Sequence, residues 1–176
     1  EVQKLQTGVA SLQFENRYIC KDGSIRWLVW SVFPEVKSGL LYAVASDITD
    51  KKEIENALNV ANTFFYMSFD MFVVIKDENF VKVNPAFTRI LGYDQQEIIN
   101  KPFLSFIHPD DASIFMDGVK KLRISDSVVT HRVRERLKDG SYKWFDWTST
   151  IDIQTGIIYA VARDVSELIA NEESLK

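Results

Sequence analysis

Two hydrophobic patterns divide this chain into segments. Near the middle, apolar residues recur at the three- and four-residue spacing of one helical face, which predicts a helix there. These residues are Ile54, Ala57, Leu58, Ala61 and Phe65. On either side lie short apolar or alternating runs bounded by turn-forming residues, which are typical of strands. The mixture of helices and antiparallel strands predicts an α+β fold.

The segment after the predicted helix begins with a hairpin. Met71–Lys76 and Phe80–Val83 are apolar and rich in β-branched residues, and the polar residues between them favour a turn. Asn84-Pro85 predicts the start of a short helix, because Asn caps exposed N–H groups and Pro fits the first helical position. Gly92 is expected at the left-handed exit of that helix.

Further helix starts and three more strands complete the pattern. Asp94 with Glu97 predicts a capping box, and a longer helix is expected from Pro109 to about Arg123. Strands are then expected at about 127–137, 142–150 and 156–164, where the residues between the first two favour a tight hairpin turn. Ser166 is expected to cap a final helix.

The sequence also repeats itself at a fixed interval. Lys21-Asp22-Gly23-Ser24 recurs as Lys138-Asp139-Gly140-Ser141, a shift of 117 residues (138 minus 21). At this shift 18 of 59 aligned pairs are identical, and Tyr42–Ala45 coincides with Tyr159–Ala162. An interval this long indicates a repeated domain rather than a solenoid unit. The first 59 residues therefore correspond to the second half of one copy.

The ordered motifs resemble a tandem of PAS domains with their C-terminal PAC segments. The matching stretches are Asn84-Pro85-Ala86-Phe87, Leu91-Gly92-Tyr93, Ile107–Asp111, Lys138–Trp144 and Ala162–Ser166. The resemblance implies a five-stranded antiparallel sheet with helices over one face, preceded by a truncated three-stranded half copy. It assigns residues 1–49 to the C-terminal (PAC) half of a first PAS domain, 50–68 to a linker helix, 69–166 to a complete PAS/PAC domain and 167–176 to an outgoing signalling helix.

A sensory or signal-transduction role follows from the resemblance. It implies a multidomain cytoplasmic protein, most often a sensor histidine kinase and less often a diguanylate cyclase, whose membrane anchor, if it has one, lies elsewhere. A ligand or partner would alter packing in the complete domain, and the change would reach the helix after Asp164-Val165-Ser166. A cofactor-bearing sensor and a purely dimerising module remain as alternatives.

Composition and charge narrow the possible partners. A hydrophobic content of 46% supports a packed core, and a net charge of −4 gives no reason to expect nucleic acid. No apolar run approaches the ~18 residues of a spanning helix, so no membrane segment is expected within the chain. The single cysteine, Cys20, excludes an intramolecular disulfide and fits a reducing compartment.

Catalytic and metal chemistry find little support in the residues. Two histidines, one cysteine and isolated glycines provide no nucleophile motif, no phosphate loop and no zinc spacing. His108 is expected at a helix boundary, and Asp110 and Asp111 are expected to oppose the positive end of that helix. The fragment is therefore expected to have no catalytic residue and no metal.

Flavin and haem sensors of the superfamily supply two further tests. A covalent flavin sensor carries a cysteine in the helical segment after Gly-Tyr, and residues 94–106 contain none. A haem sensor carries its iron ligand on the long helix, where residues 109–123 contain no histidine. No cofactor is expected, although an unknown small ligand is possible. His131, on a strand face where the repeat has Phe14, is interpreted first as a hydrogen-bonded inward histidine, then as a ligand contact and last as an iron ligand.

Two sites are predicted in the complete domain. A ligand cavity between sheet and helices would be lined by Phe72, Phe87, Leu91, Phe106, Phe115, His131 and Trp147. These residues are mostly apolar, so the expected ligand is small and apolar or aromatic, with one polar handle. The resemblance assigns signal relay to Asp164 and Ser166, and to their repeat equivalents Asp47 and Thr49. Simple capping or solvated acids are the alternative.

Self-association is predicted from two features. Trp144 and Trp147 lie three apart on one strand and so point to opposite faces, which suits a sheet covered on both sides. The strands of residues 1–48 also carry many apolar side chains for a three-stranded sheet. These side chains are Leu12, Phe14, Tyr18, Trp27, Leu28, Trp30 and Phe33. Residues 1–48 are expected to pack against another chain or the complete domain, in a dimer.

Overall fold

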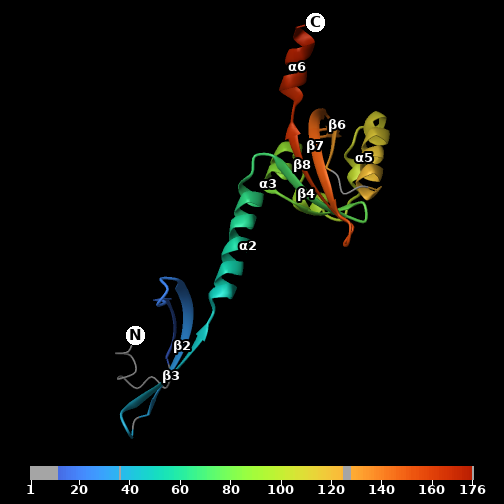
Figure 1. Cartoon of the computed structure of the whole chain (residues 1–176). Coiled ribbons are helices and arrows are strands. Elements are labelled where there is room, and N and C mark those ends of the chain that lie inside the picture. The colour runs from blue at the N-terminus through green and yellow to red at the C-terminus, as the bar shows by residue number, and fades with distance from the viewer. Residues whose placement is uncertain (1–11, 36, 125–127, 176) are drawn as a thin grey trace. The chain divides into compact units, whose positions relative to one another are not determined.

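The computed structural model describes residues 12–35, 37–124 and 128–175, and the chain divides into two compact units, Glu1–Asn62 and Thr63–Lys176. The first, called unit 1, contains a three-stranded antiparallel meander followed by a helix (Figure 1). Its strands are β1 (Leu12–Ile19), β2 (Ile25–Glu35) and β3 (Leu40–Asp47), and the helix α2 (Thr49–Met67) continues into the second unit. The helix predicted near the middle of the sequence is thus confirmed.

The second unit, called unit 2, contains a five-stranded antiparallel sheet with strand order β5-β4-β8-β7-β6. Its strands are β4 (Met71–Lys76), β5 (Asn79–Val83), β6 (Val129–Arg136), β7 (Tyr142–Asp152) and β8 (Ile157–Asp164). Its helices are α3 (Pro85–Leu91), α4 (Gln95–Ile98), η1 (Phe103–Ser105), η2 (Pro109–Asp111), α5 (Ala112–Ile124) and α6 (Ser166–Ser174). The predicted α+β class and the predicted order of elements are confirmed.

Local sequence signals set the helix ends in unit 2. The Asn84 side chain accepts a hydrogen bond from the Phe87 backbone N–H at 3.2 Å, and Pro85 occupies the first helical position of α3. The helix ends at Gly92, whose φ of 81° is the left-handed conformation that glycine adopts without strain. Asp94 and Glu97 form the predicted capping box at the start of α4.

The core of unit 2 lies between the sheet and helices α3 to α5. Alternation along the strands turns every second residue toward these helices, as in β4, where Met71, Val73 and Ile75 are buried. On β7 the same alternation buries Phe145, Trp147 and Ser149. This alternation determines which polar residues enter the core.

Unit 1 taken by itself buries little apolar surface. Among its described residues, Val32 is the single buried hydrophobic side chain, although several strand residues are large and apolar. The exposed set includes Tyr18, Ile25, Phe33, Leu41, Tyr42 and Val44.

Within the described part of the chain, no helix combines the length and apolar character needed to cross a membrane.

Candidate ligand cavity and helix junction

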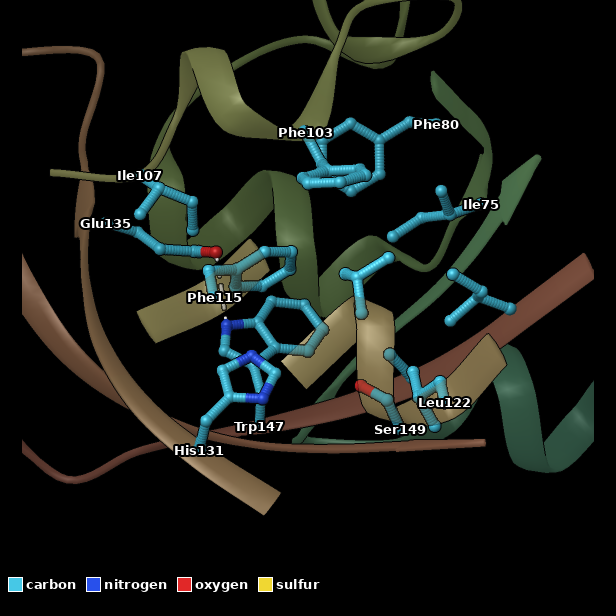
Figure 2. Close-up of a pocket in the computed structure, with 13 residues that line it drawn as sticks. Ile75, Phe80, Phe103, Ile107, Phe115, Leu122, His131, Glu135, Trp147 and Ser149 are labelled. Atoms are coloured by element: carbon cyan, nitrogen blue, oxygen red, sulfur yellow. Dashed lines mark hydrogen bonds between the residues drawn. The ribbon is translucent and has the colours of Figure 1, made fainter. Parts of the chain in front are cut away.

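A small cavity lies in the core of unit 2, on the inner face of the sheet (Figure 2). Its volume is about 10 Å³, close to the smallest space that holds one water molecule. Its walls come from strands β4 to β8, the η1 segment and α5. The lining residues are Ile75, Phe80, Phe103, Ile107, Phe115, Val119, Leu122, His131, Glu135, Trp147, Ser149, Ile158 and Ala160.

Three polar side chains give this cavity its chemistry. The indole Nε1–H of Trp147 donates to Glu135 Oε1 at 3.1 Å, which is the dashed line in Figure 2. Both ring nitrogens of His131 and the second carboxyl oxygen of Glu135 are shut off from solvent without a hydrogen-bond partner. No other side-chain nitrogen or oxygen in the described part of the chain is buried and unpaired. Each unpaired buried group costs about 1–3 kcal/mol, so such a cluster calls for an explanation.

Burial makes both titratable groups of the cavity uncharged near neutral pH. It lowers the pKa of His131 to about 4, because the imidazolium form loses its hydration. Burial also raises the pKa of Glu135 to about 8, although the hydrogen bond from Trp147 acts in the opposite direction. The cavity near pH 7 therefore presents a neutral imidazole and a carboxylic acid that is mostly protonated.

Helix α5 approaches the histidine closely because it carries a glycine. A Cβ atom added at Gly118 would lie 3.2 Å from His131 Nδ1, which is tighter than most real Cβ contacts. One turn earlier, the ring of Phe115 meets the imidazole edge-on, with centroids 4.6 Å apart. The imidazole is thus held between an aromatic ring and bare helix backbone.

The repeat in unit 1 shows that the polar cluster is not part of the shared scaffold. At the shift of 117 residues, His131 corresponds to Phe14 and Glu135 to Tyr18, whereas Trp147 corresponds to another tryptophan, Trp30. In unit 1 the indole of that tryptophan donates instead to Asn16 Oδ1, at 3.1 Å. Aromatic residues thus occupy, in unit 1, both positions that carry titratable groups in the cavity.

Three of the seven predicted cavity residues line this space, namely Phe115, His131 and Trp147. Phe87, Leu91 and Phe106 are buried in the same hydrophobic core but do not line the cavity. The rings of Phe87 and Phe106 pack edge-on against Phe80, with centroids 5.3 Å and 5.6 Å from it.

The assignment of Phe72 to the cavity needs correction. Alternation along β4 turns Phe72 to the opposite face of the sheet from Met71 and Val73. There it lines an outer groove of about 280 Å³ with Phe65 and Tyr159.

His131 faces inward as predicted, but no protein group forms the hydrogen bond that was expected for its ring. Glu135, Ser149 and Gly118 were not singled out from the sequence. Glu135 lies between two arginines, so the segment resembles a solvated stripe. The signal that could have identified it is the period of two, which places residue 135 on the same strand face as residue 131.

Arg132 and Arg134, on the same strand as Glu135, lie on the outer side of the sheet and have partners. Arg132 pairs with Asp146, and the guanidinium of Arg134 makes two bonds to Asp111, at 2.9 and 2.7 Å. Asp111 is buried and is held by this arginine, so the helix-dipole explanation given for it was incomplete. Arg134 also lies 5.1 Å above the ring of Trp144, on the face opposite Trp147.

The junction between β8 and α6 is the second predicted site. The Val165 N–H donates to the Trp144 carbonyl at 2.9 Å, and the Trp144 N–H donates to Ser166 Oγ at 3.0 Å. The Ser166 N–H in turn donates to Asp164 Oδ1 at 3.0 Å, and Lys143 Nζ donates to Oδ2 at 2.8 Å. Partial burial opposes ionisation of Asp164, but these bonds hold its pKa below the ordinary value.

The same set of bonds recurs in unit 1. Ile48 N–H donates to the Trp27 carbonyl at 2.8 Å, and Trp27 N–H donates to Thr49 Oγ1 at 2.9 Å. Thr49 N–H donates to Asp47 Oδ1 at 2.9 Å, and Arg26 donates to Asp47 Oδ2 at 3.1 Å. Each unit thus ties the first residues of its outgoing helix to the middle strand of its C-terminal hairpins.

One detail of the predicted junction is wrong. Ser166 does not cap α6 with its side chain, because the N-cap position belongs to Val165, which makes no side-chain cap bond. The hydroxyl is used across the sheet instead, as acceptor for the Trp144 N–H. Among the described residues no group of three or more His, Cys, Asp or Glu side chains could hold a metal ion.

Comparison with known proteins supports the motif resemblance in unit 2. Residues 80–158 match the family model described as the PAS fold. Basic helix-loop-helix ARNT-like protein 2 of mouse is 31% identical over 98 residues, which is 52% of this chain and 16% of that protein. Sporulation kinase E of Bacillus subtilis is 22% identical over 150 residues, which is 82% of this chain and 20% of that kinase. The chain therefore spans a fifth or less of these relatives.

A solved structure agrees with the fold. A domain of a sensory box sensor histidine kinase/response regulator from Geobacter sulfurreducens superposes with a TM-score of 0.53 at 17% identity. The match covers 63% of this chain and 96% of that domain. These matches do not establish the three strands of unit 1 as half of a second domain of the same kind.

Proposed function

We propose that unit 2, which contains the stretch matching the PAS fold, is a sensory domain and the input module of a larger signalling protein. In this proposal the state of the cavity around Glu135 and Trp147 is passed along the sheet to the start of α6. The helix then carries the change to an output domain, as a shift between two packing states of the junction. Unit 1, with the same junction bonds, would pass a related change into α2.

One observation carries this proposal. The strand β7 serves both sites, since the side chain of Trp147 enters the cavity and the backbone of Trp144 holds Val165 and Ser166. Only two residues, Phe145 and Asp146, lie between the two tryptophans along the strand. A displacement of β7 at the cavity therefore moves the groups that fix the first turn of α6.

The small size of the cavity favours a ligand whose binding moves the surrounding side chains over one that fills an existing space. A volume of about 10 Å³ admits no more than a water molecule, so a larger ligand has to displace a lining side chain. Close-packed interiors transmit such displacements, because neighbouring groups cannot absorb them locally. We propose a small, mostly apolar or aromatic ligand with one polar group that bonds to Glu135 or His131.

A sensor histidine kinase is the output we propose. Distant relatives include a sporulation kinase and, among solved folds, a sensor histidine kinase domain. The test is the autophosphorylation rate of the full-length protein carrying Ser166→Ala. We expect a changed rate, because the Trp144 N–H loses its acceptor. Ser105→Ala is the matched control, since Ser105 lies on the surface and its hydroxyl bonds to the nearby Pro102 carbonyl.

An unchanged rate in Ser166→Ala would count against relay through this junction. The rival proposal of a haem or flavin sensor is tested by the absorption spectrum of the purified protein. We expect no band in the visible range, because residues 94–106 contain no cysteine and 109–123 no histidine. A Soret or flavin band at near-stoichiometric intensity would favour the rival.

A further inference from the structure

We propose that Lys143 is shared between two carboxyl groups, Asp164 at the start of α6 and Glu135 in the cavity. When Glu135 ionises, it competes with Asp164 for the ammonium group, and the bond that holds the helix junction weakens. The consequence for an output domain rests on the function proposed above. The sharing itself is a property of unit 2 alone.

Strand register places the cavity acid beside this lysine. Glu135 on β6 pairs directly with Lys143 on β7, two residues beyond the pair of Val133 with Phe145. Directly opposed residues in an antiparallel pair point to the same face, with Cβ atoms about 4.5–5.5 Å apart. Both side chains are long enough to bridge that distance, so the two charged ends can meet after rotation about their side-chain bonds.

The two groups are presently held apart by other partners. Trp147 Nε1 holds one oxygen of Glu135 at 3.1 Å and draws the carboxyl group toward the cavity. Lys143 Nζ points to Asp164 Oδ2 at 2.8 Å, across to β8. Glu135 Oε2 has no partner, whereas Asp164 receives a further bond from the Ser166 N–H. The junction bond of Lys143 is therefore the arrangement that belongs to an uncharged Glu135.

Within the lining of the cavity, no residue other than His131 could supply a cation to pair with Glu135. Of the residues that line the cavity, only His131 is also titratable, and burial keeps it neutral near pH 7. The lining residues of α5, η1, β4 and β5 are all apolar, and those of β8 are Ile158 and Ala160. A buried carboxylate without a partner is costly, so ionised Glu135 would be driven toward Lys143.

Unit 1 contains the same pair without the competing acid. Arg26 takes the place of Lys143 and bonds Asp47 at 3.1 Å, while Tyr18 stands opposite it where unit 2 has Glu135. The cation and the junction aspartate are thus common to both units. The second carboxylate is specific to unit 2, which makes unit 1 an internal control.

The experiment is an NMR titration of the whole chain between pH 6 and pH 10. It follows the backbone amides of Val165 and Ser166 and the 13Cε signal of Lys143. We expect all three signals to move together with a midpoint near pH 8, where burial places the pKa of Glu135. The amides of Ile48 and Thr49, at the junction of unit 1, should show no such step.

Two variants identify the source of the step. Glu135→Gln removes the titrating group and should abolish it, and Lys143→Met removes the shared cation and should leave the Val165 and Ser166 amides unmoved near pH 8. The proposal is overturned if these amides do not respond in the unmodified chain, or if the step persists in either folded variant.

The titration needs no output domain, so its failure would leave the relay through Ser166 standing. Conversely, an autophosphorylation rate that is unchanged in Ser166→Ala would contradict the relay but would leave the sharing of Lys143 unaffected.

Discussion

Replacing Glu135 by glutamine should change the pH dependence of stability in unit 2. Glutamine retains a side-chain oxygen that can accept the bond from Trp147 Nε1, now 3.1 Å long, and it has nearly the same volume. What it removes is the buried ionisable group. The variant thus separates the electrostatic role of the residue from its packing role.

The expected magnitude follows from linkage between protonation and folding. Burial raises the pKa of Glu135 from its ordinary value of 4.5 to about 8. Between these values the folded state keeps a proton that the unfolded state has released, so stability falls as the pH rises. The window spans about 3.5 pH units at about 1.4 kcal/mol each, which amounts to about 5 kcal/mol in total.

The histidine in the same cavity acts in the opposite direction at lower pH. Burial lowers the pKa of His131 from 6.5 to about 4, so its contribution to stability rises with pH across that range. Between pH 4.5 and pH 6.5 the two contributions offset one another. From pH 6.5 to pH 8 only Glu135 contributes, and the unmodified chain should lose about 2 kcal/mol.

Urea unfolding at several pH values measures this slope, followed by the amide signals of β7 so that unit 2 is observed alone. We expect the free energy of unfolding of Glu135→Gln to be flat from pH 6.5 to pH 8. Glu167→Gln, at an exposed position on α6, is the matched control and should keep the original slope. Equal slopes in all three proteins would refute the assignment of a buried, mostly protonated acid.

Three further predictions concern other parts of the chain. His131→Leu should raise the free energy of unfolding at pH 7 by about 1 kcal/mol, because two unpaired buried nitrogens are removed. It should also make stability rise as the pH falls from 6.5 to 4.5, because the contribution of Glu135 is then no longer offset; the same urea series would detect either failure. Asp164→Ala should lower the free energy of unfolding by about 0.5–2 kcal/mol. Hydrogen exchange should increase in α6 while the sheet amides keep their signals, and a globally unfolded variant would contradict a local role. Size exclusion with light scattering at tens of micromolar should show a dimer, given the exposed apolar side chains of unit 1; a monomer whose first fifty residues are rapidly digested would contradict it.

Much of the fold could be predicted because its signals are local. Asn84-Pro85, Gly92 and the Asp94–Glu97 box each act within a few residues, and the structure uses all of them as expected. The strand faces follow from alternation, which also explains the inward direction of His131. Phe72 was misplaced only because its hydrophobic character was given more weight than its position in the alternation.

The features that were missed depend on contacts between residues far apart in the sequence. The Trp144 N–H reaches Ser166 Oγ across 22 residues, so capping was the simplest local role for that hydroxyl. Whether His131 has a partner depends on Gly118 and on the opposite strand, and the sequence near the histidine carries no sign of either. Local chemistry thus identifies the candidate groups, and strand pairing decides what they bond to.

Comparison of the two units separates what the fold needs from what the cavity adds. The helix junction is the same in both, since Asp47 and Asp164 each accept from a cation on the neighbouring strand and from a backbone N–H two residues on. The residues at positions 14 and 131 differ, and a difference that leaves His131 unpaired does not improve stability. The junction is thus retained in both units, whereas the polar cluster occurs only in unit 2 and costs free energy. This is the pattern expected if the cavity alone has become specialised.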